Sequence, residues 1–198
     1  IMDNEHQELE IVASPKEHEI ITTNADEIIK KTKKKKKEKK KVDIQISTDV
    51  PYYRRNKLSE ADQIFLENNG YIISNQTPIG EARSSVFLIR DNKTESPEHI
   101  FLVANIVEHI KKYTKEVETF HEVKPDIIFK TKKGVEVALE IETGLGLDKH
   151  KGRVKDKLEK LKKDYKKFHF ILTNAELKHK YKKLGVNPLI RKDIPQLL

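Results

Sequence analysis

Three acidic residues in the second half of the chain have the types and the spacing of a metal-binding site. Asp126 follows Pro125 at the head of an apolar run, and Glu140 and Glu142 close a second run fourteen and sixteen residues later. Glu140 and Glu142 are two residues apart, so on a strand they point to the same face. Carboxylate oxygens are ligands that hard cations prefer. The three residues therefore predict a hard-cation site, provided that the fold brings Asp126 to the two glutamates.

The elements that must do this are a pair of strands. Apolar and polar side chains alternate over residues 135–142, which is typical of a strand with one face in the core. Lys-Lys-Gly at 132–134 can turn the chain, so that residues 127–130 and 135–142 form a hairpin. Such a hairpin sets Asp126 beside the glutamates. The alternative is an ordinary amphipathic strand whose carboxylates face solvent and bind nothing.

The two runs resemble the motif of the PD-(D/E)XK nuclease superfamily, with Pro125-Asp126 as its first element and Glu140-Ile141-Glu142 as its second. The resemblance implies that Asp126 and Glu140 bind Mg²⁺ (or Mn²⁺) directly, with the carbonyl of Ile141 as a further ligand. The chain departs from the family at Glu142, where the usual residue is lysine, although some restriction endonucleases have Glu or Gln there. Glu142 is then expected to be a second ligand or to orient the attacking water.

More narrowly, Lys124-Pro125-Asp126 followed by Leu-Glu-Ile-Glu-Thr-Gly and a lysine-rich helix is similar to nuclease-like domains of conjugation and plasmid-replication proteins from bacterial mobile elements. In the superfamily the preceding helix often adds one more acidic ligand. Glu98 and Glu108 are the candidates, and Glu98 fits the family position better. His99 and His109 are expected to lie on the surface of this helix rather than to bind a metal.

A lysine on the helix after the second motif can replace the missing motif lysine. The apolar stripe of this helix is formed by Leu147, Val154, Leu158, Leu161 and Tyr165. Lys151 falls on the same stripe, so it either extends from the edge of the core to solvent or points at the carboxylates. In several branches of the superfamily the catalytic lysine has moved to this helix, which favours Lys151. Lys149, Lys151, Arg153 and Lys155 are expected to hold the DNA backbone.

Residues 93–198 are predicted to form an α/β (α+β) restriction-endonuclease-like core, a central mixed sheet flanked by helices. Ser96-Pro97 begins a helix, and its stripe of Ile100, Val103, Val107 and Ile110 is expected to face the core. Residues 168–172 read as an internal strand, and a last helix is expected from Ala175 to about Leu184. The order helix, strand, strand, helix, strand matches the core of the superfamily.

The first 92 residues divide into two segments. Residues 1–41 form a charged, lysine-rich extension whose run at 34–41 serves as a linker or an arm for phosphate contacts. Residues 42–92 form a small α/β segment, with a short strand at 42–46, a helix after Ser59 and strands at 71–73 and 86–89. This segment is either a winged-helix-like module or edge strands of the next domain, and the pattern slightly favours edge strands.

Tyr52-Tyr53-Arg54-Arg55 interleaves aromatic and charged side chains. Such a stretch can stack on bases and bind phosphates, or it can be a packed loop.

Composition limits the classes of function. The 198 residues carry a net charge of +8, which suits nucleic acid as a partner, although a lysine-rich composition alone can produce it. Cysteine is absent, which excludes disulfides, zinc-thiolate sites and cysteine nucleophiles. No apolar run approaches the ~20 residues of a membrane span and no signal-peptide core begins the chain, so a cytoplasmic protein is expected. The opening Ile1-Met2 is typical of the edge of a fragment of a longer protein.

The sequence thus predicts a metal-dependent DNA endonuclease or nicking domain of a mobile-element protein. The rival hypothesis is a nuclease-fold module with a degenerate site, which binds DNA or docks within a larger conjugation or replication protein. A homodimer and a place in conjugation machinery both stay open.

Overall fold

The computed structural model describes residues 46–121, 124–145, 147 and 151–197, with the backbone alone at Lys151. The chain divides after Lys41 into two units, and the first lies outside the described residues, as does most of the strand expected at 42–46. None of the described helices is long and apolar enough to cross a membrane.

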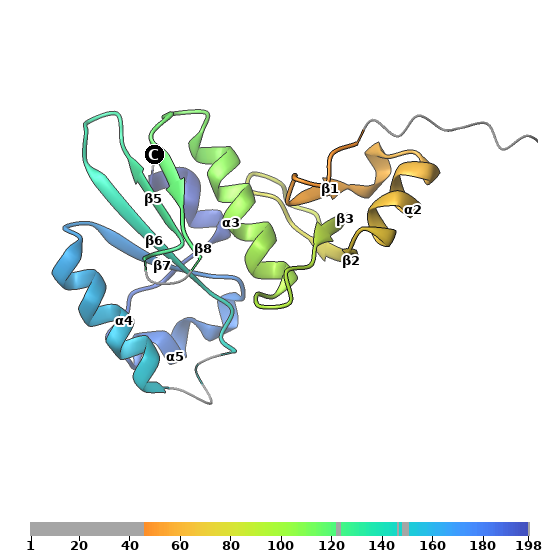
Figure 1. Cartoon of the computed structure of the whole chain (residues 1–198). Helices are drawn as coiled ribbons and strands as arrows, with labels where there is room; N and C mark the ends of the chain where they lie inside the picture. The colour runs from red at the N-terminus through yellow and green to blue at the C-terminus, as the bar shows by residue number, and fades with distance from the viewer. Residues whose placement is uncertain (1–45, 122–123, 146, 148–150, 198) are drawn as a thin grey trace, which may run out of the picture. The chain divides into compact units, whose positions relative to one another are not determined.

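A five-stranded sheet forms the centre of the second unit (Figure 1). Its strands, in spatial order, are β4 (Val117–Thr119), β5 (Ile127–Lys130), β6 (Glu136–Glu142), β7 (Phe168–Leu172) and β8 (Leu189–Ile190). The pairs β4–β5 and β5–β6 are antiparallel, whereas β6–β7 and β7–β8 are parallel. The predicted hairpin is confirmed, and Gly134 closes its turn with a φ of +72°, which favours glycine.

Helices cover both faces of this sheet. On one face lies α3 (Pro97–Ile110), capped by Ser96 as expected, together with the 3₁₀ segment η3 (Arg191–Leu197). On the other lie α4 (Lys151–Asp164) and α5 (Lys178–Lys182). The predicted class, a mixed sheet flanked by helices, is confirmed. The helix expected from Ala175 to about Leu184 is instead a 3₁₀ turn, η2 (Ala175–Leu177), followed by the short α5.

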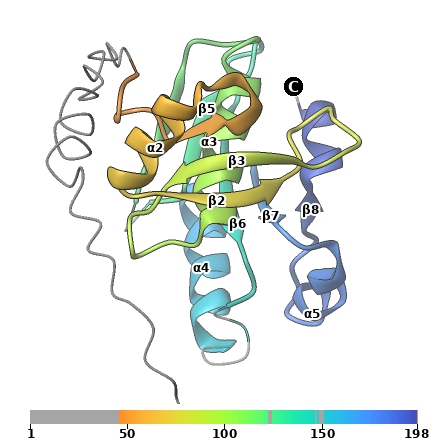
Figure 2. The ribbon, with the colours of Figure 1, turned by 90° about the vertical axis from the view of Figure 1, so that its right-hand side faces the viewer.

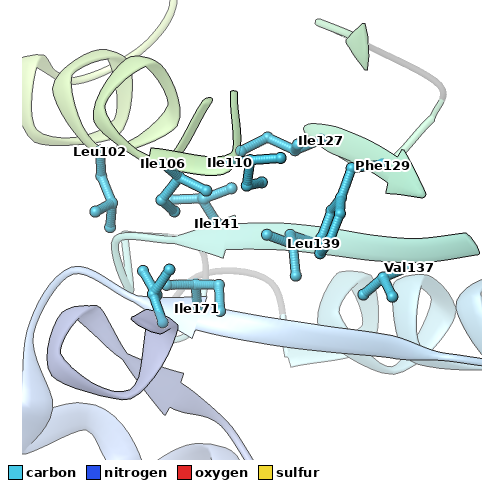
Figure 3. Packing of buried hydrophobic residues seen from close by; sticks show 10 residues of the cluster. Leu102, Ile106, Ile110, Ile127, Phe129, Val137, Leu139, Ile141 and Ile171 are labelled. Carbon is cyan, nitrogen blue, oxygen red and sulfur yellow. The ribbon is translucent and has the colours of Figure 1, made fainter. Parts of the chain in front are cut away.

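The core beneath α3 differs from the predicted stripe (Figure 3). Leu102, Ile106 and Ile110 pack on the sheet, while Ile100, Val103 and Val107 are only partly buried. Phe101 is also fully buried, but against Phe87 of another sheet. Because α3 packs against two sheets, its apolar surface is wider than a single stripe. The sequence pattern therefore could not predict which residues of α3 face the five-stranded sheet.

The second sheet has three strands in the order β1–β3–β2, namely β1 (Tyr52–Arg54), β2 (Tyr71–Gln76) and β3 (Ser85–Arg90). Figure 2 shows β2 and β3 running across α3. Helix α2 (Glu60–Asn68), capped by Ser59 as predicted, packs on one face, and α3 packs on the other. The favoured interpretation of this segment as edge strands of the core was wrong. β3 is paired on both sides within its own sheet and has no free edge for the core.

Side-chain hydrogen bonds fasten this small sheet to α3. Asn105 of α3 is buried; its Nδ2 donates to the hydroxyl of Tyr52 (3.2 Å), and its Oδ1 accepts from the backbone N–H of Ile79 (2.7 Å). The hydroxyl of Tyr52 donates to Glu108. The Tyr52 ring packs against Phe87 and Phe101, so it has a structural role and is not free to stack on bases.

The turn after β6 brings Gly144 against the side chain of Leu177 in η2, and this contact can be tested directly. Gly144 has a φ of +85°, and a Cβ there would collide with Cδ1 of Leu177. We expect Gly144→Ala to lower the free energy of unfolding by about 2–4 kcal/mol, from backbone strain and overpacking together. Gly134→Ala is the matched control, because it has a similar φ and open space, and should cost about 1–2 kcal/mol. Urea denaturation measures both. Adding Leu177→Ala should remove the excess cost at Gly144, and equal costs at the two glycines would refute the contact.

Candidate active site

Asp126 is placed by the unequal lengths of β5 and β6. The first residue of β5, Ile127, pairs with Leu139, so Ile141 lies beyond the end of its neighbour. Its N–H has no strand partner on that side and donates instead to Oδ2 of Asp126, at 2.7 Å. This bond satisfies a main-chain donor and fixes the Asp126 carboxylate at the end of β6. The structure therefore brings Asp126 to Glu140 and Ile141, as the hairpin predicted.

Glu140 and Glu142 are buried on the face of β6 that α4 covers. Only 6% of Glu140 and 8% of Glu142 is exposed, so the alternative of a solvated face is wrong. Ala138 on the same face packs with Val154 and Leu158 of α4. Buried carboxylates need compensating charge or hydrogen bonds, because burial alone strongly disfavours their ionised form.

Lys157 of α4 supplies that charge. Its Nζ forms an ion pair with Oε1 of Glu140 and lies 3.0 Å from Oε1 of Glu142. Sequence reasoning missed Lys157, although it lies three residues after Val154 and four before Leu161, on one flank of the apolar stripe. The predicted lysine, Lys151, flanks the other side of the stripe, and its side chain lies outside the described residues.

Glu142 differs from the other two acidic residues in its hydrogen-bond partners. The hydroxyl of Tyr181, on α5, donates to Oε2 of Glu142 at 2.9 Å, and Oε1 faces Lys157. Both carboxylate oxygens are thus occupied by protein donors, and Glu142 does not line the cleft described below. The structure therefore gives Glu142 a different surrounding from that of a metal ligand or a group that orients water.

His99 approaches Asp126 from the first turn of α3. Its Nε2 lies 3.3 Å from Oδ1 of Asp126, and its Nδ1 lies 3.5 Å from Oε2 of Glu95 without a well-formed hydrogen bond. Burial acts to lower the pKa of His99, but the hydrogen bond and charge of Asp126, aided by Glu95, raise this pKa overall. The expected ligand Glu98 is exposed and does not line the cleft. Its turn presents His99 to the site instead.

An open cleft of about 1140 Å³ exposes this cluster. Asp126 and Glu140 line it together with Lys157, and the loop before α3 contributes Glu95. Six carboxylates and four Lys or Arg side chains line it in all, so its lining is acidic overall among the described residues. Of the residues predicted to hold DNA, Arg153 lines the cleft, the exposed Lys155 does not, and Lys149 lies outside the described residues.

The charges in the cleft are unevenly compensated. Burial, the charge of Asp126 and, less strongly, that of Glu142 raise the pKa of Glu140 to about 7, although Lys157 acts to lower it. Burial acts to lower the pKa of Lys157, but Glu140 and Glu142 raise it overall, so this lysine stays charged. One ammonium therefore compensates for two glutamates with Asp126 beside them, and further positive charge would be bound favourably.

Asp126 and Glu140 fit a hard cation that keeps several water ligands. Among the described residues no group of three or more His, Asp or Glu side chains is arranged to hold a metal ion. Mg²⁺ does not require one, because it usually binds through one or two carboxylates and completes its shell with water and substrate phosphates. The carboxylates of Asp126 and Glu140 are oxygen donors of the kind that such an ion binds.

Comparison with known proteins gives one weak structural similarity. No protein-family model and no curated protein sequence matched the chain. A solved structure described as the apo form of EndoMS aligns with a TM-score of 0.29 and 14% sequence identity, over 62% of this chain and 64% of that chain. The alignment thus spans less than two thirds of EndoMS, and a TM-score of this size does not establish a shared fold.

Glu140 predicts a pH dependence of stability in the metal-free protein. Its pKa is about 7 when folded, against an ordinary value of 4.5, so the folded state retains a proton that the unfolded state has lost. The stability that Glu140 contributes is present below about pH 4.5 and lost as the pH rises through about 7. Glu140→Gln cannot ionise. We therefore expect the unfolding free energy of the parent, minus that of Glu140→Gln, to fall between about pH 4.5 and about pH 7 in chelator. A flat or rising difference would show that Glu140 is ionised in the folded state throughout.

Proposed function

We propose that this chain is a metal-dependent nuclease domain that hydrolyses phosphodiester bonds in DNA. One observation carries the proposal: the Lys157 ammonium is held at Glu140 and Glu142, with Asp126 alongside, in an open cleft. This chemistry needs carboxylates that can bind a metal and a lysine that can stabilise negative charge. Lys157 thereby takes the role that the sequence assigned to Lys151.

Asp126, Glu140 and the carbonyl of Ile141 would hold Mg²⁺ or Mn²⁺. When bound, such an ion polarises a phosphoryl oxygen and makes a water more acidic. The protein contributes fixed positions for these groups, since Asp126 is held by the Ile141 N–H and by His99, and Glu140 is held by Lys157.

Lys157 would stabilise the negative charge that develops on the phosphate. An ammonium has three donors, and the hydrogen bonds of Lys157 to Glu140 and Glu142 use two of them. Within the described residues the third has no acceptor, and Lys157 lines the cleft. A fixed donor that faces the reacting group strengthens charge stabilisation without reorganisation during the reaction.

DNA as the substrate is supported by the distribution of charge. Residues 151–192 contain fifteen Lys or Arg and four Asp or Glu. A surface of this kind binds phosphates regardless of sequence. The resemblance of the motif to mobile-element nucleases suggests a conjugation or plasmid-replication protein as the setting, and nicking as the form of cleavage.

The proposal predicts cleavage that depends on Glu140. Purified protein should nick or degrade plasmid DNA with Mg²⁺ or Mn²⁺ and stop with chelator, and Glu140→Ala should abolish cleavage while DNA binding is retained. Glu98→Ala is the control, because Glu98 is exposed outside the cleft and its loss should leave the rate unchanged. Gel analysis of plasmid forms measures both. Cleavage that survives Glu140→Ala would reveal a contaminant or another site.

The alternative function is a nucleic-acid-binding or docking module with a degenerate site. One observation favours it: Lys157, Glu140, Glu142 and Tyr181 satisfy one another as a network, which can be purely structural. Absence of cleavage on supercoiled, linear and single-stranded DNA, with DNA binding retained, would decide for this alternative.

Both functions predict salt-dependent DNA binding. Substitutions at two residues of α4 can show on which side of this helix the DNA binds. Arg153 lines the cleft, whereas Lys155, which is also exposed, lies outside it. If the strand follows the cleft, Arg153→Ala should weaken binding to all sequences and reduce the slope of log K against log salt by about 1. Lys155→Ala should change the slope less. Fluorescence anisotropy over a salt series measures this, and the reverse order would place the DNA on the other side of α4.

A further inference from the structure

We infer that Tyr181 and Glu142 are positioning residues that hold the Lys157 ammonium at the cleft. This inference rests on the proposed function, because it concerns the same lysine. The side chains form a chain of contacts from the core to the cleft: Tyr181 O–H to Glu142 Oε2, and Glu142 Oε1 to Lys157 Nζ. Tyr181 and Glu142 lie out of reach of a substrate, whereas Lys157 lines the cleft.

The chemistry of lysine makes such support necessary. A lysine side chain has four rotatable bonds, and its hydrated ammonium has many positions of similar energy. A single carboxylate, Glu140, would define one direction only. The second contact, to Glu142 at 3.0 Å, fixes the ammonium between two strand residues that cannot move independently of β6.

Glu142 can serve as an anchor only while it is itself held. It is 8% exposed, and its Oε2 has one hydrogen-bond donor among the described residues, the hydroxyl of Tyr181. A buried carboxylate oxygen without a donor is strongly disfavoured. Without that hydroxyl, Glu142 would turn toward Lys157 or water, and the ammonium would lose its fixed place.

The local fold supports Tyr181 accordingly. Its side chain is fully buried, although α5 has only five residues. Its ring packs 6.4 Å from that of Phe170 on β7, and its carbonyl accepts from the N–H of Val186 at 3.1 Å. Short as it is, α5 thus fixes one hydroxyl against the end of β6.

The test removes this hydroxyl and retains the ring. In Tyr181→Phe we expect kcat for plasmid cleavage at saturating Mn²⁺ to fall about tenfold or more, as for the loss of one hydrogen bond to an ionised group. KM for DNA and the Mn²⁺ concentration at half activity should stay unchanged, because the cleft surface and the metal ligands are untouched. Tyr113→Phe is the control: Tyr113 is exposed and does not line the cleft, so this variant should cut DNA at the parental rate. Glu142→Gln replaces Tyr181→Phe if that variant melts below the assay temperature, and the same fall is expected.

A double-mutant cycle gives a second readout that needs no activity. Tyr181 and Lys157 interact through Glu142, so the stability losses of Tyr181→Phe and Lys157→Met should not add in urea denaturation. If the parent cuts DNA and Tyr181→Phe cuts equally well, the inference is overturned while the proposed function stands. If the parent does not cut, the proposed function fails, and the cycle alone decides: non-additive losses support the positioning of Lys157, and additive losses overturn it.

Discussion

Two glutamates buried on one face of β6 are the constraint around which this structure is arranged. Neither can remain ionised there without a cation and donors nearby, because desolvation of a carboxylate is costly. Lys157 provides the cation, and helix α4 covers β6 in a way that brings Lys157 to both carboxylates. Apolar residues in place of the two glutamates would have packed against α4 without burying charge. The buried charges on this face of β6 therefore cost stability, and a function at the site would explain why they are present.

The same constraint separates the roles of the acidic residues. Asp126 and Glu140 keep contact with the cleft, while Glu142 is enclosed behind Lys157. The structure places the Lys157 ammonium 3.0 Å from Oε1 of Glu142. The positive charge beside the acidic residues of β6 therefore comes from the helix that faces this strand.

Local patterns were enough to predict the elements that carry the site. Alternation over residues 135–142 and the turn before Val135 predicted the hairpin, and the hairpin predicted that Asp126 meets Glu140. These signals are local because the elements are consecutive in the chain. Helical spacing alone could not choose between Lys151 and Lys157, since both flank one apolar stripe and the choice depends on how α4 rotates over the sheet.

The contacts that the sequence did not reveal join distant segments. Tyr181 lies 39 residues from Glu142, and its role depends on the place of α5 in the fold. His99 was expected on a helix surface, yet the start of α3 lies against Asp126. The sequence periodicity of this segment indicated strands, but periodicity does not show which strands pair with one another. Strands β1–β3 form a sheet of their own.

The loop between β3 and α3 illustrates how the small sheet bears on the cleft. Asn92, Thr94 and Glu95 line one side of the cleft, and the strand and helix at the two ends of the loop are joined by the packing of Phe87 on Phe101. Both ends of the loop are thus attached to elements that this aromatic contact and the hydrogen bonds of Asn105 hold together. The small sheet contributes no side chain from its strands to the lining, yet it anchors a loop that does.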